Sequence, residues 1–152
     1  MTATDGTKAQ ISPYIGSPSL APSDPATVGG GNDSLDGVEQ IIADNAAQFE
    51  GQFYQTQQKS IESLKLLRNE YLQVYLVNQH NQIIGEVDTH DAPTKFRGFI
   101  ILPQTFYVGS KALGGHVDRD SNPIRFALNA NWSDKLHVVT PTDFQPLVNL
   151  AN

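Results

Sequence analysis

The amino-terminal third of the chain carries too little apolar surface to fold by itself, and this constrains what the remainder can build. Residues 1–33 include four prolines and the run Gly29-Gly30-Gly31, with Ser, Thr and Ala filling most of the gaps. Burial of so few apolar groups does not offset the entropy lost when the segment becomes ordered. The composition therefore predicts an extended arm that is ordered against a neighbouring chain.

A small apolar group interrupts the arm among its prolines. Proline restricts the backbone and lowers the entropy lost when such a strip docks in extended form. We therefore predict a docking peptide whose partner-binding residues are Ile11, Tyr14, Ile15 and Leu20. The alternative is a flexible tail that has no binding role.

The next segment, residues 34–72, has the features of one long α-helix. Ser34 precedes Asp36 and Glu39, the acids that a helix dipole favours in the first turns, and no proline follows before Tyr71. Apolar residues recur at steps of three or four, as on one face of a helix: they are Ile42, Ala46, Phe49, Phe53, Ile61, Leu64, Leu67 and Tyr71. A break at Gly51, giving two shorter helices, is the alternative.

The length of this helix predicts an oligomer. About 38 helical residues span roughly 57 Å, whereas a domain built from the remaining residues is under about 30 Å wide. The uncovered apolar stripe would pack against identical helices in a parallel bundle. The predicted seam consists of Ile42, Phe49, Phe53 and Leu64.

Residues 73–152 have the pattern of a small all-β head with a carboxy-terminal tail. Six short segments are rich in β-branched and aromatic residues, and clusters of turn-forming residues separate them. The segments are residues 73–77, 82–87, 96–102, 105–108, 124–128 and 135–140. The predicted fold class is α+β: an extended arm over 1–33, a long helix over 34–72, and an antiparallel sandwich or barrel over 73–152.

Charge and composition exclude several function classes. The net charge is −6 without any basic run, so we expect no nucleic acid as a partner. Cysteine is absent, and no apolar run approaches the length of a membrane span. The amino terminus lacks the features of a signal peptide, so we expect synthesis in a cytoplasm. The charged fraction of 17% suits a protein that is packed against others.

Two loops contain possible metal ligands, which keeps a small metal-dependent hydrolase as an alternative. Imidazole and carboxylate groups form a zinc or iron set if the loops converge in space; the candidates are His90, Asp91, His116 and Asp118. Asp, Asn and Ser also make turns, and turns explain these residues more simply. We therefore predict no metal, no cofactor and no catalytic residue, and expect that the protein is not an enzyme.

The stretch from Asp118 to Asn122 also imitates the start of a calcium-binding loop, with oxygen-bearing side chains at alternate positions. It departs from that pattern at Pro123, where a glycine belongs, and at Asn129, where an acid belongs. Trp132 follows a turn and could stack on a sugar, but a loop tryptophan more often covers a core. A receptor- or glycan-binding head on a helical stalk is thus a further alternative.

The combination of an arm, a long amide-rich helix and a β head resembles the auxiliary structural proteins of bacteriophage virions. Capsid decoration or cement proteins are the nearest type, and short trimeric tail or spike proteins come next. The resemblance is one of architecture and has no diagnostic motif. It implies a virion location and a homotrimer whose arms clamp neighbouring shell subunits, and it carries no functional residue over to this chain.

Overall fold

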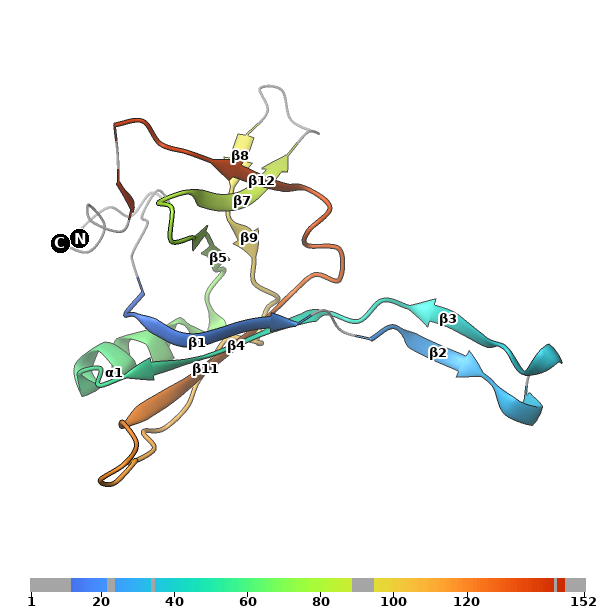
Figure 1. The fold of residues 1–152 in the computed structure, drawn as a ribbon, viewed down its shortest axis with the longest axis horizontal. Coiled ribbons are helices and arrows are strands. Elements are labelled where there is room, and N and C mark those ends of the chain that lie inside the picture. Colours follow the sequence, from blue (N-terminus) through green and yellow to red (C-terminus); the bar gives the residue numbers. More distant parts are fainter. Residues whose placement is uncertain (1–11, 22–23, 34, 89–94, 144, 147–152) are drawn as a thin grey trace.

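The fold is organised around one antiparallel four-stranded sheet that combines strands from both halves of the chain. The computed structural model describes residues 12–21, 24–33, 35–88, 95–143 and 145–146. The strand order is β1-β4-β11-β10, and Figure 1 shows these strands crossing the lower half of the body. Their bounds are Ile15–Ala21 for β1, Ala47–Tyr54 for β4, Tyr107–Val108 for β10 and Ser121–Leu128 for β11.

A second group of strands lies above this sheet in Figure 1. Strand β7 is paired with β12 on one edge and with β6 and β8 on the other, and β5 pairs with β9. After β9 the chain bridges to β11 through Ile101 and Leu128, which ties the second group to the main sheet. The bounds are β5 Gln73–Val74, β6 Leu76–Val77, β7 Ile83–Asp88, β8 Lys95–Arg97, β9 Phe99–Ile100 and β12 Leu136–Val139.

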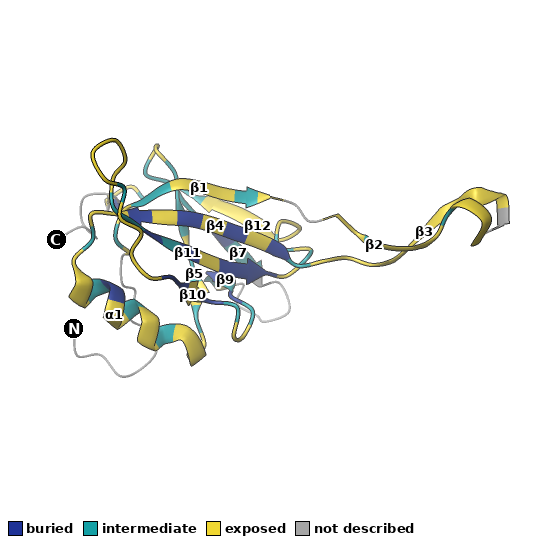
Figure 2. Ribbon diagram, turned by 90° about the horizontal axis from the view of Figure 1, so that it is seen from below, coloured by how far each residue is buried: buried dark blue, intermediate teal, exposed yellow. Residues whose placement is uncertain are grey.

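The long helix predicted over residues 34–72 is wrong, because a buried strand occupies its centre. Along β4 every second residue is buried and the residues between them are exposed, as the alternating colours of this strand show in Figure 2. This period of two is that of a sheet with one solvated face. Phe49 and Phe53 are four positions apart, a spacing that places them on one face of either a helix or a strand.

The α-helix that does form, α1, covers Gln58–Leu66 and is followed by a 3-10 turn, Leu67–Asn69. It begins after a turn in which Gln55 adopts a positive φ of 51°. Ile61 is fully buried, and Leu64 and Leu67 pack against the core at the three-residue spacing of one helix face. The helix thus covers one side of the main sheet, as Figure 2 shows below β10 and β11.

The core lies between the main sheet, α1 and the second group of strands. The rings of Phe49 and Phe126, paired across β4 and β11, are stacked with centroids 4.4 Å apart. The other buried apolar side chains of this cluster come from both halves of the chain; they are Phe53, Ile61, Phe99, Ile101, Phe106, Val108, Ile124 and Leu128. A core of this composition is one hydrophobic unit rather than a separate head and stalk.

The correction to the predicted fold class follows from these pairings. The protein is mostly β, with several sheets and one short helix among the described residues, in place of an arm, a long helix and an independent β head. Strands form close to each of the six ranges predicted after residue 73. These strands do not form a separate sandwich or barrel, because β11 pairs mainly with β4, and β4 also pairs with β1.

A substitution at Gly51 distinguishes a strand from a helix at this position, because the two predict changes in stability of opposite sign. A Cβ atom at Gly51 would lie 2.5 Å from Cγ2 of Ile15 and 3.3 Å from Cε1 of Phe49. We expect Gly51→Ala to destabilise the fold by about 1–3 kcal/mol through overpacking, whereas in a helix it would stabilise by roughly 0.5–1 kcal/mol. Thermal unfolding measures this, with the exposed neighbour substitution Gln52→Ala as a near-neutral control. A raised midpoint for Gly51→Ala would contradict the strand.

Candidate functional site

A two-stranded ribbon projects from the body and is the most distinctive surface feature of the described chain. It consists of β2, Ala26–Gly29, and β3, Glu39–Ala43, paired antiparallel with each other. Neither strand belongs to another sheet. Figure 1 shows the ribbon extending well beyond the body on the side away from α1.

Local chemistry explains why the chain reverses where it does at the ribbon tip. Two 3-10 turns, Gly31–Asp33 and Leu35–Gly37, connect the strands. Positive φ angles occur at Gly30 (99°) and Gly37 (67°), and also at Asp36 (66°). Glycine and aspartate are among the residues that adopt this conformation most readily. The sequence around the glycine run is thus used to build a tip rather than to cap a helix.

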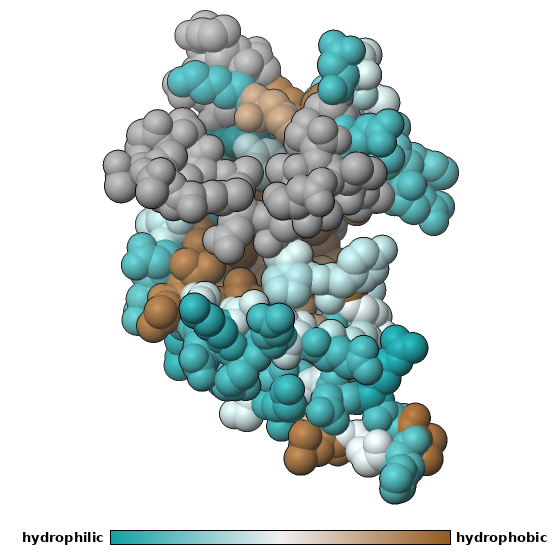
Figure 3. Space-filling model, turned by 90° about the vertical axis from the view of Figure 1, so that its left-hand side faces the viewer, coloured by the Kyte–Doolittle hydropathy of each residue, from teal (hydrophilic) through white to brown (hydrophobic). Residues whose placement is uncertain are grey.

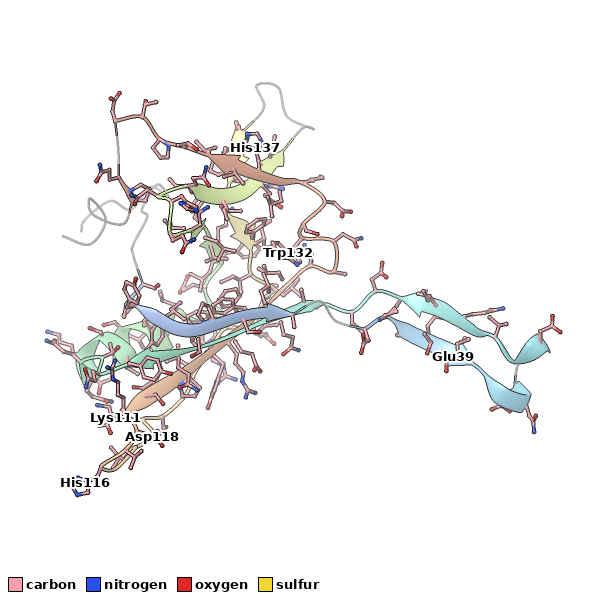
Figure 4. The ribbon with its side chains drawn as sticks, in the orientation of Figure 1. Glu39, Lys111, His116, Asp118, Trp132 and His137 are labelled. Atoms are coloured by element: carbon pink, nitrogen blue, oxygen red, sulfur yellow. The ribbon has the colours of Figure 1, made fainter. Side chains whose placement is uncertain are left out.

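Side-chain hydrogen bonds hold the base and the middle of the ribbon together. Near the base, Asn45 Nδ2 donates to the carbonyl oxygen of Asp24 at 2.7 Å. Along the strands, Thr27 Oγ1 donates to Glu39 Oε2 at 3.3 Å. Figure 4 labels Glu39 on the ribbon, far from the other labelled side chains.

Apolar side chains on the ribbon face solvent. Ile41 is 67% exposed and Ile42 is 64% exposed, and because neighbouring strand residues point to opposite faces, both faces of the ribbon are apolar. Val28 and Val38 are more than half exposed as well. An isolated two-stranded hairpin is only marginally stable in water. Exposed isoleucine and valine on such an element indicate a surface that another molecule covers.

The charges of the ribbon all have one sign. Between residues 24 and 45 the charged residues are five acids with no base. They are Asp24, Asp33, Asp36, Glu39 and Asp44. A partner surface that accepts this ribbon therefore has to combine apolar groups with positive charge.

The predicted docking peptide is divided between the core and the surface. Ile15 and Leu20 lie in β1, opposite Phe53 and Phe49 of β4, and both pack against the chain's own core. Tyr14 is 90% exposed just before β1. Ile11 lies outside the described residues. Of the docking residues that the structure describes, Tyr14 is the one left available to a partner.

The predicted helical seam has no helix to lie on. Phe49 and Phe53 are buried in the chain's own core, and Leu64 packs on that core from α1. Ile42 lies on the ribbon instead and is exposed. Association between copies therefore cannot use Phe49 or Phe53, and of the four residues Ile42 is the one left exposed.

The two loops with possible metal ligands give no metal-binding cluster in the part of the chain that the structure describes. His90 and Asp91 lie outside that part. His116 and Asp118 are exposed on the loop between β10 and β11, and Figure 4 shows His116 at the loop tip, remote from His137 and Trp132. The calcium-like stretch makes turn contacts: Gly114 N–H donates to Asp120 Oδ1 at 3.3 Å, and Asn122 Nδ2 donates to the Gly109 carbonyl at 3.1 Å.

Trp132 covers the core. Its ring meets Phe99 edge to face, with centroids 5.3 Å apart and planes at 87°, and Figure 4 shows it lying between the two groups of strands. An indole in this position has one face committed to packing. The position of Trp132 therefore does not support the prediction that its ring stacks on a sugar.

The loop between β10 and β11 is a second projection with exposed apolar groups. Leu113 is 79% exposed and Val117 is 93% exposed. Figure 3 views the molecule from the α1 side and shows apolar atoms, in brown, at its lower end, where this loop lies. A shallow recess of about 670 Å³ lies between the loop and β4.

The ribbon could have been found from the sequence. Thr27-Val28 and Ile41-Ile42 are β-branched pairs on either side of a cluster rich in Gly, Asn and Asp, which is the pattern of a hairpin. The same cluster precedes two acids and an apolar periodicity, and these favoured a helix start instead. The pattern does not indicate whether the hairpin joins a larger sheet.

Comparison of the chain with known protein families, with curated proteins and with solved structures finds no match. None of the helices in the described residues is both long and apolar enough to cross a bilayer.

The turn interpretation of the loop at 114–122 is tested by comparing two aspartates. Asp120→Ala removes the acceptor of the Gly114 N–H, so we expect a loss of about 1 kcal/mol and a midpoint lower by a few degrees. Asp118→Ala should leave the midpoint unchanged, because its carboxylate accepts no hydrogen bond in the described structure. Excess EDTA should not move the wild-type midpoint. A large drop in EDTA, restored by calcium or zinc, would instead indicate a metal site.

Proposed function

We propose that this protein is a structural assembly protein, of the capsid decoration or cement type found in bacteriophage virions, that clamps neighbouring subunits with its β2–β3 ribbon. In this proposal the clamping arm is the ribbon, in place of the extended peptide over residues 1–33. The protein acts by binding rather than by catalysis, without a cofactor, and its place is in the virion after synthesis in the host cytoplasm.

The observation that carries the proposal is the exposure of Ile41 and Ile42 on a two-stranded ribbon that the rest of the chain does not cover. A ribbon can insert between the surfaces of neighbouring subunits, or add a strand to the edge of a neighbour's sheet. Insertion buries both apolar faces, whereas strand addition pairs backbone groups that are otherwise open to water. A role in assembly thus gives this marginal element the contacts that it lacks in the isolated chain.

Two further features agree with permanent contacts. A charged fraction of 17% lowers the desolvation cost of covering the surface. Tyr14 adds an exposed aromatic residue, a type enriched at interfaces, just before β1. Several copies engaging at once would convert weak individual contacts into firm attachment.

The proposal is tested by placing charges on the ribbon. In Ile41→Asp and Ile42→Asp the replaced side chains are exposed, so we expect unchanged thermal unfolding of the body. Binding should weaken by at least about tenfold, because an unpaired carboxylate is desolvated at the contact. The measurement is co-sedimentation of the purified chain with virion particles that were prepared without it.

The matched control is Gln40→Asp, which adds the same charge at an exposed position of β3 without removing an apolar group. It should retain most of the binding. If Ile41→Asp and Ile42→Asp bind the particles as well as the wild type does, the ribbon is not the clamping arm and the proposal loses its main support.

A further inference from the structure

We infer that the ribbon of one copy docks in a recess between α1 and β10 of a second copy, so that the protein associates head to tail with itself. The inference rests on the proposed role of the ribbon as a docking arm: ribbons join copies to one another, and the joined copies then engage the particle together. It also replaces the predicted helical bundle with a different surface for oligomerisation.

The recess has the chemistry that the ribbon requires. It measures about 260 Å³ and is lined by Lys65, Arg68, Phe106, Tyr107, Val108 and Ser110. The lining thus contains two bases and no acid, together with aromatic and aliphatic groups. Neither base makes an ion pair within the described residues. The ribbon, with five acids and no base, is complementary to these two bases in charge, and Tyr107, which is 47% exposed, offers its apolar groups an aromatic surface.

The backbone beside the recess is suited to receive a strand. Strand β10 stands at one end of the order β1-β4-β11-β10, so one of its edges has no strand partner in the described part of the fold. Open strand edges pair readily with an extended segment of another chain. Either strand of the ribbon offers such a segment, with Val28 or one of the two isoleucines, Ile41 or Ile42, facing the exposed ring of Tyr107.

A copy cannot fill its own recess. Figures 1 and 2 agree that the ribbon leaves the body on the side opposite α1, and Figure 2 shows β10 close to α1. The occupant therefore has to come from another molecule. An interface in which one patch meets a different patch produces a closed ring or an open filament, depending on the rotation between copies.

The test uses two variants that damage opposite halves of the contact. The ribbon variant is Ile41→Asp with Ile42→Asp, and the recess variant is Lys65→Glu with Arg68→Glu. All four side chains are exposed, so both variants should remain folded; the recess variant should unfold a few degrees lower, because its acids oppose the dipole at the carboxyl end of α1. A single contact between one ribbon and one recess should have a Kd on the order of 10–100 µM. Sedimentation velocity over a concentration series can detect association of this strength.

We expect the wild type to self-associate and each variant alone to be monomeric, with self-association weakened at least about tenfold. An equimolar mixture of the two variants should form a heterodimer that grows no further, because it contains one intact ribbon and one intact recess. Lys59→Glu, a charge reversal at an exposed position of α1 outside the recess, is the matched control and should associate like the wild type.

Three results would overturn the inference. The wild type could stay monomeric at the highest concentration, or the mixture of the two variants could fail to form a heterodimer. Loss of association in Leu113→Asp would place the contact on the neighbouring loop instead. A monomeric wild type whose attachment to particles still depends on Ile41 and Ile42 would refute self-docking and leave the proposed function intact. Self-association without ribbon-dependent attachment to particles would refute the proposed function.

Discussion

The pairing of β4 with β11 is the contact on which the rest of the fold depends. It runs without a register shift from Tyr54 opposite Ser121 to Ala47 opposite Leu128, and it stacks Phe49 on Phe126. These strands lie far apart in the sequence, so the chain loses considerable entropy in bringing them together. Aromatic packing and a full ladder of hydrogen bonds offset that loss. With the pair in place, β1 has an edge to join and α1 has a face to cover.

The same pairing gives the ribbon a fixed base. Strand β3 ends at Ala43 and β4 begins at Ala47, while β1 ends at Ala21 and β2 begins at Ala26. Two adjacent strands of the main sheet therefore continue into the two strands of the ribbon after short connections. The apolar and acidic surface of the ribbon is in this way held away from the body, whose core forms without it. The ribbon and the stable body are thus separate parts of the molecule, and a change on the ribbon need not disturb the core.

Sequence patterns were sufficient for the carboxy-terminal strands and misleading for the amino-terminal ones. After Leu72, segments rich in β-branched and aromatic residues, separated by turn clusters, predicted strands close to where they form. Before it, the four-residue step from Phe49 to Phe53 suited a helix and a strand equally. The deciding residues were the polar ones that alternate with the buried positions of β4, namely Gln48, Glu50 and Gln52. The exposure of Ile41 depends on which strands join the sheet, and that is a tertiary property that local sequence does not contain.

The continuity of the ribbon with β1 and β4 also has a mechanical meaning. In Figure 1 the ribbon prolongs the line of these strands, so tension applied at its tip would act along them. Hydrogen bonds in an antiparallel pair run across the strands. Such a load would shear the ladder between β4 and β11 as a whole instead of opening it one bond at a time. The anchorage of the ribbon is therefore of the kind that resists a pull along its own length.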